Sequence, residues 1–512
     1  MEQRMENRKK AITALTLNTI AFTVCFACWM LNGVLVTYLV ENQLAQWTEA
    51  QIGWLIGIPV LSGALFRLPV GLLTDKYGGK WVFAAVMLLS ALPMYLLSFA
   101  STYMEFFWCS LGFGMAGTSF AVGIAYTSVW FPPERQGTAL GVFGAGNAGA
   151  AITSMGAPYL LRWLTDGGQE LEAWRTMPRI YAGALVVMTV IFVLLATQKK
   201  VDDSVVTSFF HRLAPLGHLR VWRFGLYYFL VFGGFVSLAQ WLIPYYVGAY
   251  AMPLATAGML AAIFSLPSGI IRALGGFLSD HLGARRVMYW VLGSCLICCT
   301  LLIMPRMDIR SPGKAVMAKR GGTVTSVSKE QVTVDTLEYA VRPKPASEDR
   351  GFDAPQDILI WPTMIAYQEP AVELGQRVEK KEIIAHGVTH IYFQANVWVF
   401  TFLLFIVGIV MGIGKAAVYK HIPDYFPREV GVVGGIVGVL GGLGGFICPI
   451  VFGYLLEGTG LWTTCWMFFA LLSAVCLWWM HAVVRRMHFD STPALRGRME
   501  HVGHKKSDEI RH

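Results

Sequence analysis

The segment FRLPVGLLTDKYGGK, residues 66–80, returns later in the chain as IRALGGFLSDHLGARR, residues 271–286. Four residues of the first copy match four of the second at an offset of 205: Arg67, Gly71, Asp75 and Gly78 match Arg272, Gly276, Asp280 and Gly283. Each copy places one arginine inside an apolar helix and a Gly-Asp-Gly loop motif with basic residues at the helix end. The duplication predicts two pseudo-symmetric halves.

The composition excludes a set of soluble domains. Hydrophobic residues make up 55% of the 512 residues, charged residues 14%, and the mean hydropathy is +0.53. A membrane-spanning helix needs roughly 20 mostly apolar residues. Such runs occur at 12–40, 51–73, 80–99, 104–130, 136–162, 178–197, 223–250, 254–277, 285–304, 395–419, 430–457 and 461–483. We therefore predict an all-α membrane protein with twelve transmembrane helices in two six-helix halves.

A second repeat locates a long insertion in the second half. The segments PERQGTALGVFG, residues 133–144, and PREVGVVGGIVG, residues 427–438, match at an offset of 294, which exceeds 205 by 89 residues. The polar stretch 306–394 has that length. The predicted organisation is an N-terminal half at 1–197, a cytoplasmic linker at 198–222, a C-terminal half at 223–305 and 395–483, an inserted domain at 306–394 and a cytoplasmic tail at 484–512.

The insertion alternates polar and β-branched residues, which predicts a small β-rich domain. Because it follows an odd number of spans, we expect it on the periplasmic face. Residues 370–387 resemble the strand-turn-strand of lipoyl- and biotinyl-carrier folds of the barrel-sandwich type, without the Met-Lys-Met-like turn that those carriers modify. The expectation is a carrier-like scaffold without carrier chemistry, or else a plain interaction or spacer domain.

The formal net charge of +9 lies outside the insertion, because 306–394 holds twelve Lys/Arg against twelve Asp/Glu. Basic residues gather in the loops of one side, and the positive-inside rule then places both termini in the cytoplasm of an inner-membrane protein. Membrane topology accounts for the charge, and nucleic-acid binding is excluded. The nine cysteines lie in or beside apolar spans and are expected to be small core residues, with no metal site or cofactor.

The repeated arginine is the main candidate for a binding site. An arginine at the centre of a membrane span costs roughly 2.5–3.5 kcal/mol on insertion scales. No carboxylate is predicted at the depth of Arg67 and Arg272, so a mobile anion held by two guanidinium groups is the simplest partner. The alternative is that each arginine extends to the membrane interface or bonds backbone carbonyls.

Two glycine-rich helices accompany the arginines, at 141–150 and 431–445. Small residues let neighbouring helices approach closely. The predicted packing and gating glycines are Gly141, Gly144, Gly146, Gly149, Gly435, Gly438, Gly441 and Gly442. The glycines at 141–150 are not a dinucleotide-binding motif, because no predicted strand precedes them. Asn147, the polar residue in that run, could offer its amide to an anion or make an interhelical hydrogen bond.

Together these motifs resemble the major facilitator superfamily and, within it, the nitrate/nitrite porter family. The resemblance covers nearly everything outside 306–394. It implies that Arg67 and Arg272 bind nitrate or nitrite, that Asn147 donates to the anion, and that the aromatic residues Tyr228 and Phe232 close the site. Asn32, in CWMLNGVL, departs from the aromatic residue expected in some members.

Lys415, in GKAAVYKHIP, is the proton-coupling candidate. Unlike arginine, a lysine desolvated beside fixed cations can release its proton; the alternative is a cytoplasmic anchor that extends to the interface. His421 is the other titrating group available. GKAAVYKHIP and FAVGIAY, residues 120–126, resemble proton-linked nitrate importers, which ranks proton/nitrate symport above nitrate/nitrite antiport.

Two other functions stay open: a facilitator for small organic anions such as monocarboxylates, and a nitrate receptor in which the insertion signals. An enzyme is not expected, because no nucleophile, base or metal set converges.

Overall fold

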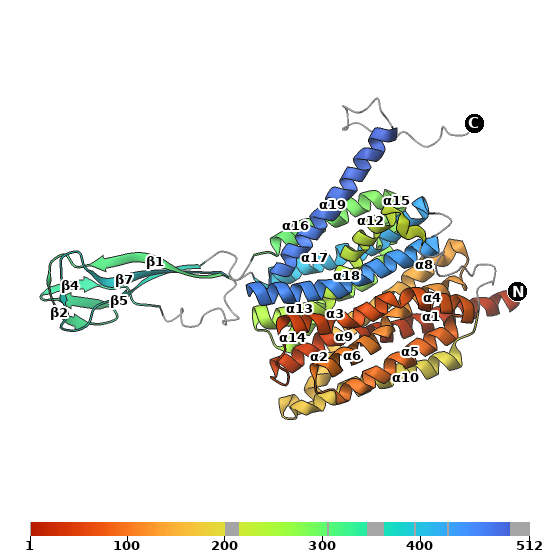
Figure 1. Cartoon of the computed structure of the whole chain (residues 1–512), viewed down its shortest axis with the longest axis horizontal. Coiled ribbons are helices and arrows are strands. Elements are labelled where there is room, and N and C mark those ends of the chain that lie inside the picture. Colours follow the sequence, from red (N-terminus) through yellow and green to blue (C-terminus); the bar gives the residue numbers. More distant parts are fainter. Residues whose placement is uncertain are drawn as a thin grey trace.

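The computed structural model describes residues 2–199, 214–304, 307–345, 363–393, 396–426 and 430–491. A bundle of long helices forms the body of the molecule, and a β-rich segment extends from one end of it (Figure 1). The N-terminus and the end of α19 (Thr464–Ser491) both lie away from that segment (Figure 1).

Helices form the whole N-terminal half. Their bounds are α1 Glu2–Trp29, α2 Asn32–Glu41, α3 Glu49–Leu65, α4 Arg67–Tyr77, α5 Gly79–Leu96, α6 Tyr103–Phe113, η2 Gly114–Thr118, α7 Ser119–Ser128, α8 Pro133–Gly144, η3 Ala145–Ala148, α9 Gly149–Leu164 and α10 Thr176–Leu195. Thr48 and Thr102 begin α3 and α6 with capping boxes, in which the threonine hydroxyl accepts from the third backbone N–H of the helix.

The C-terminal half repeats this arrangement around the insertion. Its helices are α12 Leu219–Tyr228, the π-turn η8 Phe229–Gly233, α13 Gly234–Tyr250, α14 Leu254–Ile270, α15 Arg272–Leu282, α16 Ala284–Leu301, α17 Val397–Tyr425, α18 Val430–Thr459 and α19. The Asn396 side chain accepts from the backbone N–H groups of Trp398 and Val399 and so caps α17.

Twelve spans are predicted, and the described residues contain ten helices long and apolar enough to cross a membrane. An eleventh is the pair Leu254–Ile270 and Leu274–Leu282, bent by 51°. The remaining predicted span, 136–162, is helical as α8, η3 and α9, but its glycines and Asn147 lower its hydropathy. The chain is a multi-pass membrane protein.

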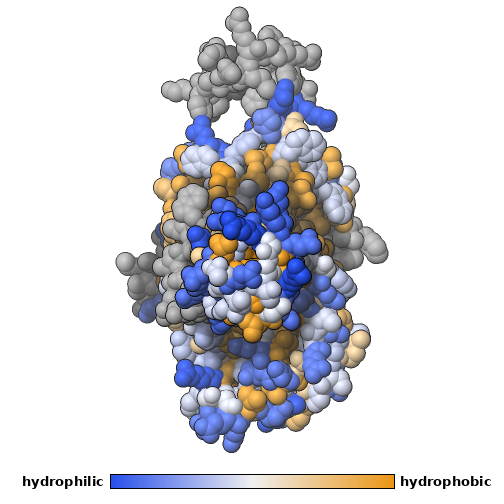
Figure 2. Space-filling view, turned by 90° about the vertical axis from the view of Figure 1, so that its left-hand side faces the viewer, coloured by the Kyte–Doolittle hydropathy of each residue, from blue (hydrophilic) through white to orange (hydrophobic). Residues whose placement is uncertain are grey.

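The β-rich segment lies between the end of α16 and the start of α17. Its strands are β1 Met307–Met317, β2 Gly322–Val327, β3 Gln331–Val334, β4 Leu337–Ala340, β5 Thr363–Pro370, β6 Arg377–Val378 and β7 Ile383–Phe393. They form one sheet in the order β1-β7-β5 and another in the order β4-β3-β2-β6. Buried Val324, Val332 and Ile384 belong to a small core of the segment's own. Hydrophilic residues cover much of its outer surface (Figure 2).

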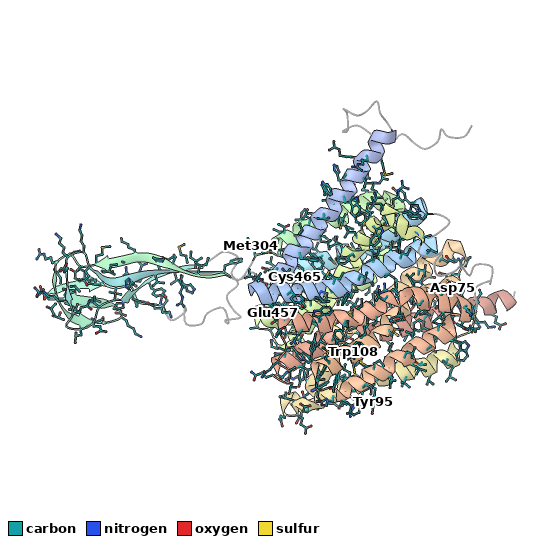
Figure 3. All side chains as sticks on the ribbon, in the orientation of Figure 1. Asp75, Tyr95, Trp108, Met304, Glu457 and Cys465 are labelled. Carbon is teal, nitrogen blue, oxygen red and sulfur yellow. The ribbon has the colours of Figure 1, made fainter. Side chains whose placement is uncertain are left out.

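Close packing of α3 on α18 joins the two halves. A Cβ on Gly57 would lie 2.5 Å from the Phe446 carbonyl oxygen, so only glycine permits this approach. Towards the insertion, the Ala50 N–H donates a 3.1 Å hydrogen bond to a carboxylate oxygen of Glu457. Asp75 lies at the opposite end of the bundle from Glu457 and Met304 (Figure 3). The halves are therefore joined at the end that carries the β-rich segment.

Candidate functional site

Arg67 is the first residue of α4, directly after a break in the helix. Phe66 has a ψ of −3°, and Pro69 lacks the N–H that would bond the Leu65 carbonyl. The arginine side chain is only 4% exposed, and its Nη1 donates a 2.7 Å hydrogen bond to the Gly438 carbonyl on α18. Nε and Nη2 are buried and have no hydrogen-bond partner among the described residues. The guanidinium group therefore keeps free donors inside the bundle.

Arg272 occupies the equivalent place in the second half. It begins α15 after a break at Ile271, whose ψ is also −3°. A Cβ on Gly144 of α8 would lie 3.3 Å from Arg272 Cδ. Gly144 and Gly438 match in the repeat, so each arginine reaches the corresponding glycine of the opposite half. Nη1 of Arg272 is buried and also lacks a partner in the described part of the chain.

Phe120, on α7, lies between the two arginines. Its ring centroid is 5.4 Å from Arg67 Cζ and 5.3 Å from Arg272 Cζ. A ring face attracts a cation by about 0.5–2 kcal/mol, depending on desolvation. Both guanidinium groups thus face one aromatic ring from opposite halves of the protein.

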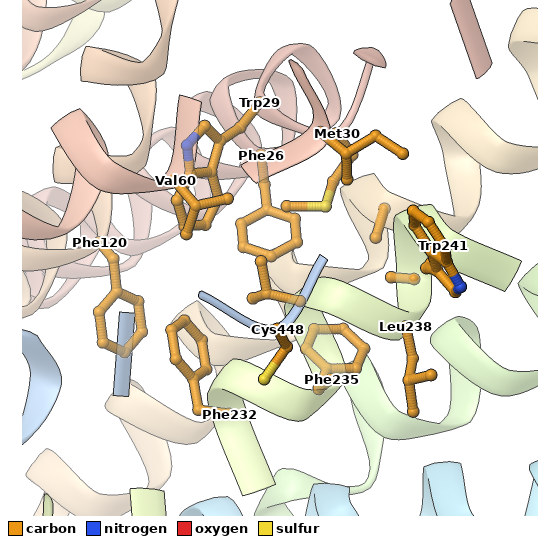
Figure 4. Packing of buried hydrophobic residues seen from close by; sticks show 14 of the residues in the cluster. Phe26, Trp29, Met30, Val60, Phe120, Phe232, Phe235, Leu238, Trp241 and Cys448 are labelled. Carbon is orange, nitrogen blue, oxygen red and sulfur yellow. The ribbon is translucent and has the colours of Figure 1, made fainter. Parts of the chain in front are cut away.

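Further aromatic rings surround the pair. Phe232 and Trp29 lie 5.1 and 5.9 Å from Arg67 Cζ, and Tyr419 lies 5.5 Å from Arg272 Cζ. The close-up shows Phe120 facing Phe232, with Trp29 nearby on the first helix (Figure 4). Aromatic walls of this kind exclude water and leave guanidinium N–H groups as the polar surface of the site.

Tyr228 and Phe232 stack on each other, with centroids 5.0 Å apart and an interplanar angle of 4°. Tyr228 also meets Tyr419 edge to face at 5.0 Å. The Tyr419 hydroxyl donates a 3.0 Å hydrogen bond to the Gly434 carbonyl, whereas the buried Tyr228 hydroxyl has no partner among the described residues. The two predicted aromatic residues therefore belong to the shell around the arginines.

Asn147 lies in η3, three residues after Gly144. It is fully buried, and neither amide atom has a hydrogen-bond partner among the described residues. A Cβ on Gly269 of α14 would lie 3.2 Å from the Asn147 carbonyl carbon, so the backbone of the opposite half packs directly here. The amide group is thus available at the interface between the halves.

Lys415 is completely buried on α17. Its Nζ lies 3.5 Å from the ring centroid of Phe235 and has no hydrogen-bond partner in the described part of the chain. It precedes Tyr419 by one helical turn, so both side chains lie on one face of α17. A side chain with no exposure is not an anchor that extends to the membrane interface.

The electrostatic balance of the interior is positive. The buried charged side chains include Arg67, Arg223 and Lys415, and none of the aspartates and glutamates whose side chains the structure describes is buried. Burying a charge without a counter-charge is costly. An anion at the two arginines would supply that counter-charge.

Several of the predicted glycines lie at helix crossings. A Cβ on Gly442 would lie 2.6 Å from Ala64 Cβ, one on Gly146 would meet Phe22, and one on Gly441 would meet the Tyr228 ring. Gly149 packs against the backbone of α1. Close approach therefore governs these positions in both halves.

The loop motif lies apart from the arginine site, at the ends of α4 and α15. Gly78 and Gly283 end these helices with φ of +83° and +86°, a conformation that favours glycine. Asp280 pairs with Lys420 at 2.6 Å. Gly71 and Gly276 have no atom within 4 Å of a Cβ position, so close packing does not explain them.

Asn32 makes its hydrogen bonds to α3 and α6. Its amide donates to the Leu55 carbonyl at 2.6 Å and to the Ser110 hydroxyl at 2.9 Å. Trp29, one turn earlier, supplies the first-helix wall that sequence reasoning sought at Asn32. Phe120 and Tyr419 were missed as well, although they occur in the FAVGIAY and GKAAVYKHIP segments singled out for other reasons.

A model of the Major Facilitator Superfamily matches residues 17–318 and 383–502. The chain is 36% identical, over 95% of its own length and 94% of the relative, to a probable nitrate/nitrite antiporter NarK1 of Thermus thermophilus. It is 24% identical to a nitrite extrusion protein of Bacillus subtilis, over 91% of this chain and 94% of that one.

Solved structures show the same fold at low sequence identity. A bacterial homologue of the lysosomal transporter Spinster, in an inward-facing and unoccupied conformation, matches with a TM-score of 0.58 and 13% identity, covering 92% of this chain and 96% of that one. The nucleoside transporter NupG matches with a TM-score of 0.56 and 14% identity, covering 92% and 98%.

Proposed function

Because the chain belongs to the Major Facilitator Superfamily and, within it, to the nitrate/nitrite transporters, we propose that it carries nitrate and nitrite across the membrane. Transport would proceed by alternating access of the two halves around Arg67 and Arg272. The observation that carries this proposal is the pair of arginines facing Phe120, with buried N–H donors left over and, among the side chains that the structure describes, no buried carboxylate to neutralise them.

We propose a separate task for each group. A guanidinium fork suits a planar oxyanion, and charge-assisted hydrogen bonds are roughly twice as strong as neutral ones. Arg67 and Arg272 would approach the anion from opposite halves, and the Asn147 amide would add a donor. The stacked rings of Tyr228 and Phe232 would hold the flat face of the anion and keep water out.

The hydrogen bond from Arg67 to Gly438 supports a way of coupling anion binding to movement. Gly438 belongs to the other half, so separating the halves at this level breaks the bond. An anion that takes over the freed donors would compensate for the loss. An empty carrier that keeps the bond would change state less readily, and this dependence of movement on cargo is the property that nitrate/nitrite exchange requires.

For coupling we propose proton-linked nitrate import with Lys415 as the group that binds and releases the proton. Its burial without a carboxylate partner among the described residues supports a titrating role. Nitrate/nitrite exchange is the second candidate, since the Thermus relative is named as a probable antiporter. Exchange needs no titrating group, only that the doubly cationic empty carrier cannot change state.

We further propose an inner-membrane location with both termini in the cytoplasm and the β-rich segment on the periplasmic side. The basic residues near Asp75 and the position of the β-rich segment at the other end of the bundle support this orientation (Figure 3).

The test is nitrate uptake into proteoliposomes under an imposed pH gradient, with either nothing or nitrite inside. Symport predicts that an acidic exterior drives uptake into empty vesicles. Exchange predicts uptake only when nitrite is inside, whatever the gradient. Absence of nitrate transport in every arrangement would contradict the proposed function itself.

A further inference from the structure

A second cluster of basic residues lies between α12, α16, α17 and α19, outside the arginine site. It lines a partly open cavity of about 280 Å³, a volume that includes space continuous with the solvent. The polar side chains in its wall are Arg223, Tyr227, Arg285, His421 and Tyr425. None of the described lining residues is acidic, so the cluster is a positively charged cavity that the transport mechanism does not use.

Burial makes the charge in this cavity costly. Arg223 is only 8% exposed, and the Phe224 ring centroid lies 5.4 Å from its Cζ. Arg285 Nη2 donates a 3.1 Å hydrogen bond to the Tyr425 hydroxyl, which is a neutral partner. Two guanidinium groups thus share the cavity without a carboxylate among the described lining residues.

Tyr227 supplies an independent sign of a ligand. Its side chain is 2% exposed, and its hydroxyl has no hydrogen-bond partner in the described part of the chain. Buried hydroxyl groups in proteins nearly always have a partner. Tyr227 lines the same cavity as the two arginines. An oxyanion bound beside all three side chains would accept hydrogen bonds from them.

The wall of the cavity that α19 forms is apolar, and it consists of Met480, Val483, Val484 and Met487. Arg485 and Arg486, on the same stretch of α19, are exposed, as expected near the end of a membrane span. A cationic cavity with one apolar wall, near the end of a membrane span, suits a phosphate group that is attached to a hydrocarbon chain.

We propose that this cavity binds a phosphate group, either that of an anionic phospholipid or free phosphate. Arg223 and Arg285 provide the charge, and the Tyr227 hydroxyl donates to a phosphate oxygen. The site also touches the helices of the transport site, because Tyr227 precedes Tyr228 and Tyr425 follows Tyr419 on α17. The bound group would hold α12, α16, α17 and α19 together.

Thermal unfolding of the purified full chain in detergent tests the site. The probes are dioctanoyl phosphatidylglycerol, dioctanoyl phosphatidylcholine and inorganic phosphate. We expect phosphatidylglycerol to raise the Tm by several degrees and phosphatidylcholine to leave it unchanged. Arg223→Gln and Arg285→Gln should abolish the shift, whereas Arg486→Gln, the same charge change at an exposed position of α19, should preserve it.

A third variant and the inorganic phosphate probe complete the experiment. Tyr227→Phe should reduce the shift and, together with Arg285→Gln, carries the test if Arg223→Gln does not purify as a folded protein. An equal shift with phosphate, lost in the same variants, identifies the ligand as free phosphate; its absence identifies the lipid. A shift that survives in both arginine variants, that disappears equally in Arg486→Gln, or that no anionic probe produces, overturns the proposal.

Discussion

Arg67 and Gly438 belong to opposite halves of the chain, and a 2.7 Å hydrogen bond from the arginine Nη1 to the glycine carbonyl joins them. The repeat reverses the relationship on the other side, where Arg272 of the second half packs against Gly144 of the first. Each arginine thus belongs to one half of the chain and contacts a glycine of the other half. A bound anion at this level would contact both halves at once, which is the arrangement that alternating access requires.

Replacing either arginine with lysine should cost at least about tenfold in nitrate uptake. Lysine keeps the charge but loses the planar fork that binds an oxyanion through two hydrogen bonds. Uptake into proteoliposomes measures the effect for Arg67→Lys and Arg272→Lys separately. Arg486→Lys, at an exposed position, is the matched control and should transport normally. Normal uptake by both site variants would argue against bidentate binding.

A methyl group at Gly144 should disturb the site without unfolding the protein. The added Cβ would lie 3.3 Å from Arg272 Cδ, so the arginine must shift. We expect Gly144→Ala to raise the KM for nitrate several-fold. Gly156→Ala is the control, because nothing lies within 4 Å of that Cβ position. Equal kinetics for the two variants would mean that Gly144 does not position the arginine.

Phe120 should contribute through its ring rather than through its bulk. Phe120→Leu keeps an apolar side chain but removes the ring face that both guanidinium groups share. Since each cation–π contact contributes about 0.5–2 kcal/mol, a loss of about tenfold in transport is expected. Phe99→Leu removes a comparable contact, 5.2 Å from Arg179, outside the site. That variant should transport like the unmodified protein.

Removing the Lys415 ammonium should separate transport from the proton. Lys415→Met keeps an unbranched side chain of similar length over Phe235 and cannot titrate. We predict that nitrate uptake by this variant no longer responds to an imposed pH gradient, while nitrate/nitrite counterflow continues. The control is Lys420→Met, which removes a partly exposed lysine paired with Asp280. An unchanged gradient response in Lys415→Met would exclude this lysine from coupling.

Deleting residues 306–394 distinguishes a transporter from a receptor. The strands of this segment form two sheets with a core of their own, so the helical bundle does not depend on them for its packing. We expect the deletion variant to reach the membrane and to retain most of its nitrate uptake in proteoliposomes. Loss of transport with correct folding would give the segment a role in the transport cycle.

The helical membrane architecture and the arginine pair could be predicted from the sequence because both leave local signals. Apolar runs of span length and a charge inside such a run need no tertiary information. The partners of the arginines could not be predicted in this way. Gly438 accepts through its backbone carbonyl, which any residue type carries, and Phe120 is one of 31 phenylalanines.

The two helix breaks before the arginines also could not be predicted from the sequence alone. Phe66 and Ile271 differ in residue type, yet each ends a helix with ψ of −3° directly before an arginine. A proline follows the first break at position 69, whereas the second copy has leucine at the matching position 274. The second break therefore occurs without a proline at the matching position, and residue types at these positions do not predict it. Trp29 was not predicted as a site residue, because its contact with Arg67 depends on the direction in which its side chain points, and the sequence does not give that direction.

The most direct test of the central claim is nitrate binding and uptake by the double variant Arg67→Gln/Arg272→Gln, compared with the unmodified protein in proteoliposomes of matched protein content. The account predicts that the variant inserts and folds but shows no saturable nitrate binding and no uptake under either a pH gradient or internal nitrite. Saturable uptake at the unmodified rate would contradict it, because the anion would then be held by something other than the two guanidinium groups.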